Sequence, residues 1–215
     1  MKRILKRGLS VVLACAMAFT SLVSGISANE VTEVKSDDIL EITSDGFPSD
    51  IDLINIEELT ELAVPEGVKV IEKEAFKGAK KLESVVIADS VEIIEEGAFA
   101  DCESLKSVVL PQNLAEIAPK TFMNCSSLQE IILPESVKVI GDEAFSYCRT
   151  LSEINLENVE SIWFSAFEYT ALADVNISNT TVEIGEQAFK DCKFLKKIVL
   201  PSNLKEIPSM FINGS

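Results

Sequence analysis

The sequence predicts a repeat solenoid, a rod or arc of stacked 23-residue coils that is mostly β with short turns or helical segments. Three observations support this prediction. One phrase recurs along most of the chain, apolar residues alternate at the start of each copy, and a phenylalanine recurs near the end of each copy. One coil has too little apolar area to fold alone, so the copies must stack to bury a continuous core.

The first 28 residues have the pattern of a secretory signal peptide. Four basic residues and no acid precede an apolar run from Leu9 to about Val23, and small residues follow as far as Ala28. The apolar run is shorter than the roughly 20 residues that cross a bilayer, which favours cleavage over an uncleaved anchor. We therefore expect residues 1–28 to be removed and the protein to be secreted or held at the cell surface, with no membrane contact beyond export.

The rest of the chain is expected to divide into two parts. Residues 29–58 are rich in acids and do not fit the repeated phrase, so we expect an N-terminal cap or linker before the first coil. Residues 59–215 hold six full repeats and a partial seventh, which begin at Leu59, Leu82, Leu105, Leu128, Leu151, Leu172 and Leu195. The fifth repeat has 21 residues, and each of the other full repeats has 23.

Each copy begins with a strand pattern. Val108 and Leu110 fall on one face and Ser107 and Val109 on the other, as in a strand with one buried face. A proline then ends the strand in most copies, because proline cannot donate to a strand ladder. A second short segment with inward apolar residues follows, and after it comes one phenylalanine column of Phe76, Phe99, Phe122, Phe145, Phe167 and Phe189.

The phrase LxxIxLPxxVxxIxxxAFxxCxx resembles the BspA-like, or treponemal-type, leucine-rich repeat of bacterial surface proteins. The match covers residues 59 to about 211, and its Pro, Ala-Phe and Cys positions are the specific part. Departures are local: Ala88 and Ser178 replace the proline, and Ala79 and Thr170 replace the cysteine. The resemblance implies a surface protein, since BspA-like proteins are associated with attachment to host matrix proteins and with bacterial co-aggregation.

Four cysteines share one repeat position: Cys102, Cys125, Cys148 and Cys192. In coils about 4.8 Å apart their side chains run parallel instead of converging, and Cys192 has no cysteine in the coil next to it. At most one disulfide could form. We expect buried thiols that act as small apolar residues.

Composition excludes several functions. The chain has no histidine, which removes Ser-His-Asp and Cys-His catalysis and most catalytic zinc sites. Its 35 acidic and 19 basic residues give a net charge of −16, which disfavours nucleic acid and anionic membranes as partners. No phosphate-binding loop or EF-hand spacing occurs. We expect no enzymatic activity, no metal site and no cofactor.

The outward residues of the first strands form a candidate binding face. It consists of Glu61, Val86, Val109, Glu130, Ile132, Glu153 and Asp174. Acidic residues beside consecutive outward aliphatics are typical of an extended binding surface on a solenoid. The alternative is that valine and isoleucine stand there for strand propensity alone.

The fifth copy carries a candidate aromatic anchor. Trp163 and Phe164 occupy positions that are mostly polar turn in the other copies. An exposed aromatic pair is typical of a binding hot spot. The alternative is that both side chains fold over the gap left by the shortened loops of this copy and fill the core.

Two functions remain open at this point. The first is adhesion or capture of an extracellular protein, such as the host matrix proteins that the resemblance implies. The second is a recognition or spacer module, for example for glycans, within a larger exported protein. The last copy ends at FINGS where FMNCSS would continue, which favours a truncated sequence; in a complete chain such an open end predicts end-to-end self-association.

Overall fold

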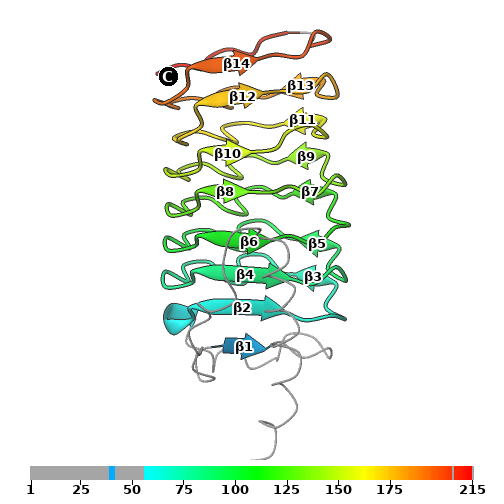
Figure 1. The fold of residues 1–215 in the computed structure, drawn as a ribbon, viewed down its shortest axis with the longest axis vertical. Coiled ribbons are helices and arrows are strands. Elements are labelled where there is room, and N and C mark those ends of the chain that lie inside the picture. The colour runs from blue at the N-terminus through cyan, green and yellow to red at the C-terminus, as the bar shows by residue number, and fades with distance from the viewer. Residues whose placement is uncertain (1–38, 42–55, 205, 215) are drawn as a thin grey trace, which may run out of the picture.

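The computed structural model describes residues 39–41, 56–204 and 206–214. These residues form a stack of coils, and each of the six full repeats contributes one strand to each of two columns (Figure 1). The predicted signal peptide and most of the predicted cap lie outside the described residues. The solenoid itself is confirmed.

The first strand column has strands of two to four residues. They are β2 (Glu61–Val64), β4 (Ser84–Ile87), β6 (Ser107–Val109), β8 (Glu130–Ile131), β10 (Glu153–Ile154), β12 (Asp174–Asn176) and β14 (Lys197–Val199). A short strand, β1 (Ile39–Glu41), pairs in parallel with β2, with Ile39 opposite Glu61. The one helical element of the described residues is a 3-10 turn, η2 (Ile56–Glu58), so the coils are almost entirely β and turn.

The second strand column has strands of two residues. They are β3 (Val70–Ile71), β5 (Ile93–Ile94), β7 (Glu116–Ile117), β9 (Val139–Ile140), β11 (Ser161–Ile162) and β13 (Glu183–Ile184). The strand pairs of this column are parallel and join equivalent positions of neighbouring copies, as in Ile140 opposite Ile162. A parallel ladder with one fixed register follows because every copy offers the same inward residues to the copy above it.

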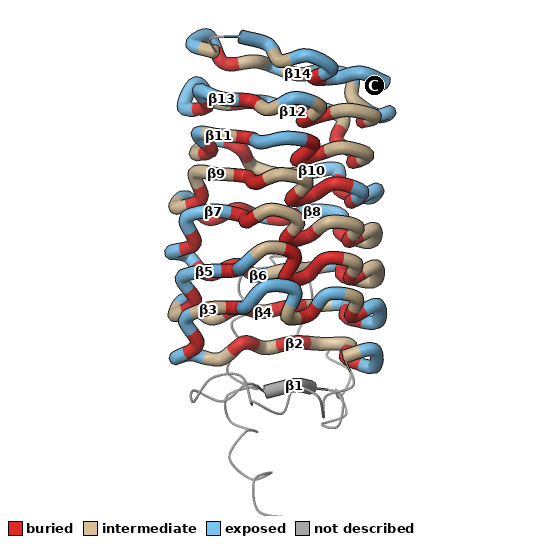
Figure 2. The backbone as a smooth tube through the Cα atoms, turned by 180° about the vertical axis from the view of Figure 1, so that it is seen from behind, coloured by how far each residue is buried: buried red, intermediate tan, exposed pale blue. Residues whose placement is uncertain are grey.

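The core lies inside the coils and runs the length of the stack (Figure 2). Leu110, Ile131 and Leu133 are buried as the alternation predicts, and Val108 is partly buried against the same cluster. The six predicted phenylalanines are buried and stack ring on ring, with centroids 5.1–5.7 Å apart. Their planes lie within 18° of one another. The predicted phenylalanine column is therefore confirmed.

A corner closes each coil around its phenylalanine. In the six corners from Phe76 to Phe189, the residues two positions before and two positions after the phenylalanine have a positive φ, such as Lys120 (58°) and Asn124 (59°) around Phe122. Only some of these positions hold glycine, among them Gly78 and Gly97. The conformation turns alternate N–H groups toward the next coil, where the N–H groups of Lys120 and Phe122 donate to the carbonyls of Asp142 and Ala144 over 2.9 Å each. We call this array the corner ladder.

The shortened fifth copy keeps its place in the stack. Asn155 compensates for the missing loop residue: its side-chain Oδ1 accepts from the Leu133 N–H (2.7 Å) and its Nδ2 donates to the Leu133 carbonyl (2.9 Å). Phe167 still stacks on Phe145 at 5.5 Å. The side-chain amide thus supplies a ladder contact that the main chain of this copy cannot.

The last copy keeps the main-chain register of the stack but carries its phenylalanine one residue early. In the earlier coils the phenylalanine N–H donates to the residue before the next phenylalanine, as from Phe167 to Ala188. Phe189 instead donates to the carbonyl of Phe211 itself, over 3.1 Å. Phe211 therefore holds the alanine position of its copy, and the expected alignment of FINGS with FMNCSS was wrong by one residue. Its ring meets that of Phe189 edge-on at 83°.

Candidate functional site

The outward surface of the first strand column brings the predicted aliphatic residues into one line. Ala63, Val86 and Val109 are register partners on β2, β4 and β6. Val86 is half-buried and Val109 is 38% exposed, whereas Ile132, which follows β8, is 74% exposed. The aliphatic part of the surface therefore projects furthest in the middle of the stack.

The acidic residues of the same surface lie beside this line. Glu130 and Glu153 are register partners on β8 and β10, and both are exposed. Asp174 is exposed at the start of β12, and Glu61 is half-buried at the start of β2. Within the described residues none of these four carboxylates forms an ion pair. Glu130 and Glu153 lie on adjacent strands, where like charges repel, whereas Asp174 has the basic Lys197 as its register partner on β14.

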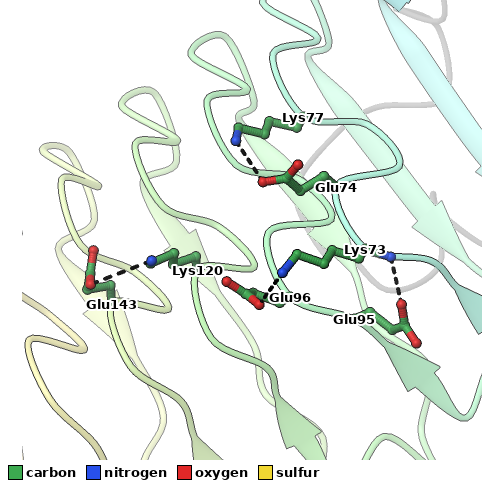
Figure 3. Close-up of polar contacts among 7 residues, drawn as sticks. All are labelled: Lys73, Glu74, Lys77, Glu95, Glu96, Lys120 and Glu143. Atoms are coloured by element: carbon green, nitrogen blue, oxygen red, sulfur yellow. Dashed lines mark hydrogen bonds and ion pairs between the residues drawn. The ribbon is translucent and has the colours of Figure 1, made fainter.

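Elsewhere on the lower coils, charges pair between copies. Lys106 contacts Glu83 at 2.8 Å, one repeat earlier in the first column. At the corners Lys73 reaches Glu96 at 2.7 Å and its main-chain N–H donates to Glu95 (Figure 3). The Lys73 hydrogen bond and charge lower the pKa of Glu96. All these pairs are solvent-exposed, so each contributes little stability.

The candidate aromatic anchor lies just after β11. Trp163 is 39% exposed and Phe164 is 42% exposed, and neither belongs to the core cluster. The interpretation that both rings fill the core is therefore wrong. Their main chain is held in the stack: the Trp163 N–H donates to the Ile140 carbonyl and the Phe164 N–H to Asp142 Oδ1, over 2.9 Å each. A fixed backbone thus presents two aromatic side chains at the surface.

A second aromatic cluster was not predicted from the sequence. The rings of Tyr147 and Tyr169 stack at 4.8 Å, and the Arg149 guanidinium lies 5.6 Å from the Tyr147 centroid. Both tyrosines have a positive φ, which is unusual for a bulky residue. The one available signal was the repeat position itself, which holds glycine, aspartate or asparagine in the other copies. Because the two rings stack on each other, they form a side-chain contact between the fourth and fifth coils.

Two shallow hollows occur on the described surface. One is lined by Lys73, Ile93, Ile94, Glu95, Glu96, Glu116, Ala118 and Pro119, on the second strand column. The other is apolar and lies on the last coil, lined by residues between Ile198 and Asn213. No cluster of three or more potential metal ligands is found within residues 39–41, 56–204 and 206–214. Nor does this part of the chain form a helix long and apolar enough to cross a membrane.

The four cysteines of the repeat position are buried free thiols, as expected. Burial raises the pKa of Cys102 and of Cys148 to about 12 and raises the pKa of Cys125 well above its usual value. Burial also raises the pKa of Cys192. A nucleophilic cysteine needs a lowered pKa and access to solvent. These thiols have neither, so they serve packing.

Comparison with known proteins identifies the repeat. The family model of the BspA type leucine rich repeat region matches in six copies, over residues 53–169 and 116–215. The chain belongs to the BspA-type leucine-rich-repeat family. None of the curated proteins compared with it matches.

Solved structures similar to this BspA-type chain come from several bacteria. A leucine rich cell surface protein of Faecalibacterium prausnitzii is 29% identical with a TM-score of 0.59, over 68% of this chain and 40% of that protein. The leucine rich repeat protein of T. pallidum is 30% identical with a TM-score of 0.48, over 66% of this chain and 59% of that one. Pneumococcal vaccine antigen PcpA is 20% identical with a TM-score of 0.49, over 73% and 54%. This BspA-type chain thus spans 40–59% of the length of these relatives.

Proposed function

We propose that this BspA-type chain is an exported, non-enzymatic rod that binds an extracellular protein through its first strand column. One observation supports this most directly: Ile132 exposes 74% of its side chain beside the uncompensated carboxylates of Glu130 and Glu153. A large apolar side chain in an acidic setting gains free energy when a partner covers it and supplies cations. Strand propensity alone would be met by a polar β-branched residue such as threonine, and it does not explain an exposed isoleucine at this position.

The proposed location rests on the signal-peptide pattern of residues 1–28 and on the Faecalibacterium relative, which is described as a cell surface protein. The proposed absence of catalysis rests on the lack of histidine and on thiols whose raised pKa keeps them protonated. Host matrix proteins are the partner class we would test first. Each of these proposals can fail without the others.

The test is binding of the purified full chain to an array that carries extracellular-matrix proteins, at low and at physiological salt. We expect hits that weaken at least tenfold with Ile132→Asp, since a buried charge without a partner costs more than about 1.4 kcal/mol. Val182→Asp is the matched control, because Val182 is also an exposed aliphatic but lies just before the second column. Equal losses with both variants, or no hits at either salt concentration, would refute binding through the first column.

A second candidate, a recognition or spacer module of a larger exported protein, follows from the lengths compared above. The chain covers 40% of the Faecalibacterium protein, so the remainder of such a protein has room for other domains. This second function is favoured if the first strand column binds no protein on the array. Its test is the length of the full gene product, which should exceed that of this chain and include a further domain.

A further inference from the structure

The outward surface of the second strand column presents the single tryptophan of the chain beside free carboxylates. In this column Glu116, Val139, Ser161 and Glu183 are register partners on successive strands. Their strands alternate outward and buried residues, so these four side chains share the outward surface. Two residues further along each strand, Ala118, Gly141, Trp163 and Gly185 hold equivalent positions, since each of the last three donates its N–H to the isoleucine carbonyl of the preceding coil.

The indole of Trp163 has no side chain beside it in its own column. Its column neighbours are Gly141 and Gly185, and both must be glycine. A Cβ on Gly141 would lie 2.6 Å from the Pro119 nitrogen, and one on Gly185 would lie 2.6 Å from the Phe164 nitrogen. The close approach of the coils therefore excludes a side chain at the positions on either side of Trp163 in this column.

Glu183 lies diagonally across from Trp163, because its register partner Ser161 is two residues before the tryptophan. Diagonal neighbours on adjacent strands are roughly 7–8 Å apart, within reach of one long side chain of a ligand. Glu183 is exposed and forms no ion pair with any described residue, and the same holds for Glu116, which lies two coils below Trp163. The lower coils differ, as Lys69 and Glu92 pair at 2.6 Å.

The same surface is hollowed below the tryptophan. Ile93, Glu116, Ala118 and Pro119 line this hollow, and Ile93 is half exposed. Among the positions equivalent to Trp163, only Gly141 lies between this hollow and the tryptophan. At about 4.8 Å per coil, the distance from Ile93 to Trp163 is spanned by an extended segment of about four or five residues.

We propose that this surface binds an extended basic peptide, with an arginine side chain laid on the indole of Trp163 and paired with Glu183. The guanidinium is planar and weakly hydrated, so it can stack on an aromatic ring while its N–H groups reach a carboxylate. The second carboxylate, Glu116, then faces a second basic residue, and the hollow at Ile93 receives an apolar one. The net charge of −16 favours a cationic partner over a neutral sugar, which could also stack on an indole.

This site is separate from the first strand column and does not rest on the function proposed for it. It also has a built-in probe, because Trp163 is the only tryptophan of the chain. The experiment is a titration of the full chain with a blocked heptapeptide in which arginine alternates with serine, followed by tryptophan fluorescence and by calorimetry. The control peptide carries citrulline, which has the shape of arginine without its charge.

We expect a saturable change in fluorescence with the arginine peptide that weakens as salt is raised, and none with the citrulline peptide. By calorimetry, Trp163→Ala should weaken binding about fivefold or more, as expected for loss of a cation–π contact. Glu183→Gln should weaken it about two- to fivefold. Phe194→Ala, which removes another exposed aromatic (63%), should change nothing, and neither should Ile132→Asp.

Three results would overturn the proposal. They are equal binding of the citrulline peptide, unchanged calorimetric binding by a Trp163→Ala variant whose circular dichroism is unaltered, and a fluorescence response to cello-oligosaccharides but not to the arginine peptide. The last result would assign the tryptophan to a sugar. Trp163→Phe, which keeps an aromatic face, separates a loss of stacking from a loss of folding, since it should retain part of the affinity.

Discussion

The Sγ of Cys125 donates a hydrogen bond to the main-chain carbonyl of Phe99, 3.3 Å away in the preceding coil. The same contact joins Cys102 to Phe76, Cys148 to Phe122 and Cys192 to Phe167. The thiol thus satisfies a buried carbonyl while filling a small apolar space. Threonine at position 170 contacts Cys192 Sγ at 3.2 Å and donates to its own coil, which shows how the one polar substitute is accommodated.

These thiols make stability fall in alkaline solution. Burial raises the pKa of Cys102 and Cys148 from an ordinary value of 9.0 to about 12, so the unfolded chain loses these protons first as pH rises. The contribution is full below pH 9 and is lost progressively between pH 9 and about 12. The free energy of unfolding of the natural chain should therefore fall more steeply over this range than that of a Cys102→Ala, Cys148→Ala variant. Urea titrations at several pH values check this, and parallel pH profiles would contradict it.

Removal of one ring from the phenylalanine column should be costly. Phe122 is fully buried between Phe99 and Phe145, so Phe122→Ala leaves a cavity and should lower the free energy of unfolding by about 3–5 kcal/mol. Chemical denaturation measures the loss. Phe194→Ala is the control and should stay within about 0.5 kcal/mol. A loss below about 1 kcal/mol at Phe122 would mean that the coils repack around the gap.

The isoleucine that ends β8 and the one that follows it should respond in opposite ways to the same change. Ile131 is buried, whereas Ile132 points outward. Ile131→Asp buries a charge and should prevent folding or lower the melting temperature strongly, while Ile132→Asp should leave it nearly unchanged. Thermal melts followed by circular dichroism compare the two. A melting temperature lowered equally by both variants would contradict the assigned orientation of the strand.

Glycine should relieve strain at the corners. Lys120 has a φ of 58°, a region in which a residue with a Cβ is disfavoured by about 1–2 kcal/mol. After the entropy that glycine gains in the unfolded chain, Lys120→Gly should still stabilise the protein by about 0.5–1 kcal/mol. Lys120→Ala is the matched control, because alanine keeps the Cβ and removes the same ion pair with Glu143. If both variants change stability equally, the φ value carries no strain.

The exposure of Trp163 can be measured without a ligand. Its indole is 39% exposed on a fixed backbone, so acrylamide should quench the native fluorescence to a substantial part of the extent seen in the unfolded chain. Iodide should quench less than acrylamide, because the surrounding surface is acidic and repels an anion. A blue-shifted emission that neither agent quenches would contradict this exposure.

Much of this fold follows from counting residues. A period of 23 with one inward alternation sets the register of both strand columns, because any slip would turn Ile131 or Leu133 to solvent. The same reasoning predicted the buried phenylalanines and the free thiols. It also placed Glu130, Ile132 and Glu153 on one outward surface, although it could not say that Ile132 projects more than Val86.

The corners could not be predicted in the same way. Nothing in the local sequence of Tyr147 or Tyr169 indicates a positive φ, since the conformation is imposed by ladder bonds to the next coil. Glycine at positions 78 and 97 was the one hint. Phe211 shows the opposite problem: aligning FINGS with FMNCSS put it at the phenylalanine position, but the main-chain bond from Phe189 puts it at the alanine position. Whether Trp163 is exposed depends equally on backbone spacing, here the two glycines beside it.

The corner ladder gives the stack a direction. Its N–H groups all point toward the later coil and its carbonyls toward the earlier one, as between Phe122 and Ala144 or Phe145 and Ala166. The peptide dipoles of successive corners therefore add along the long axis, as they do in an α-helix, with the positive end toward higher residue numbers. If the ends with the higher residue numbers of two such stacks met, the corner N–H groups of one would face the corner N–H groups of the other. The corners of such coils can therefore continue one another's hydrogen bonds only head to tail.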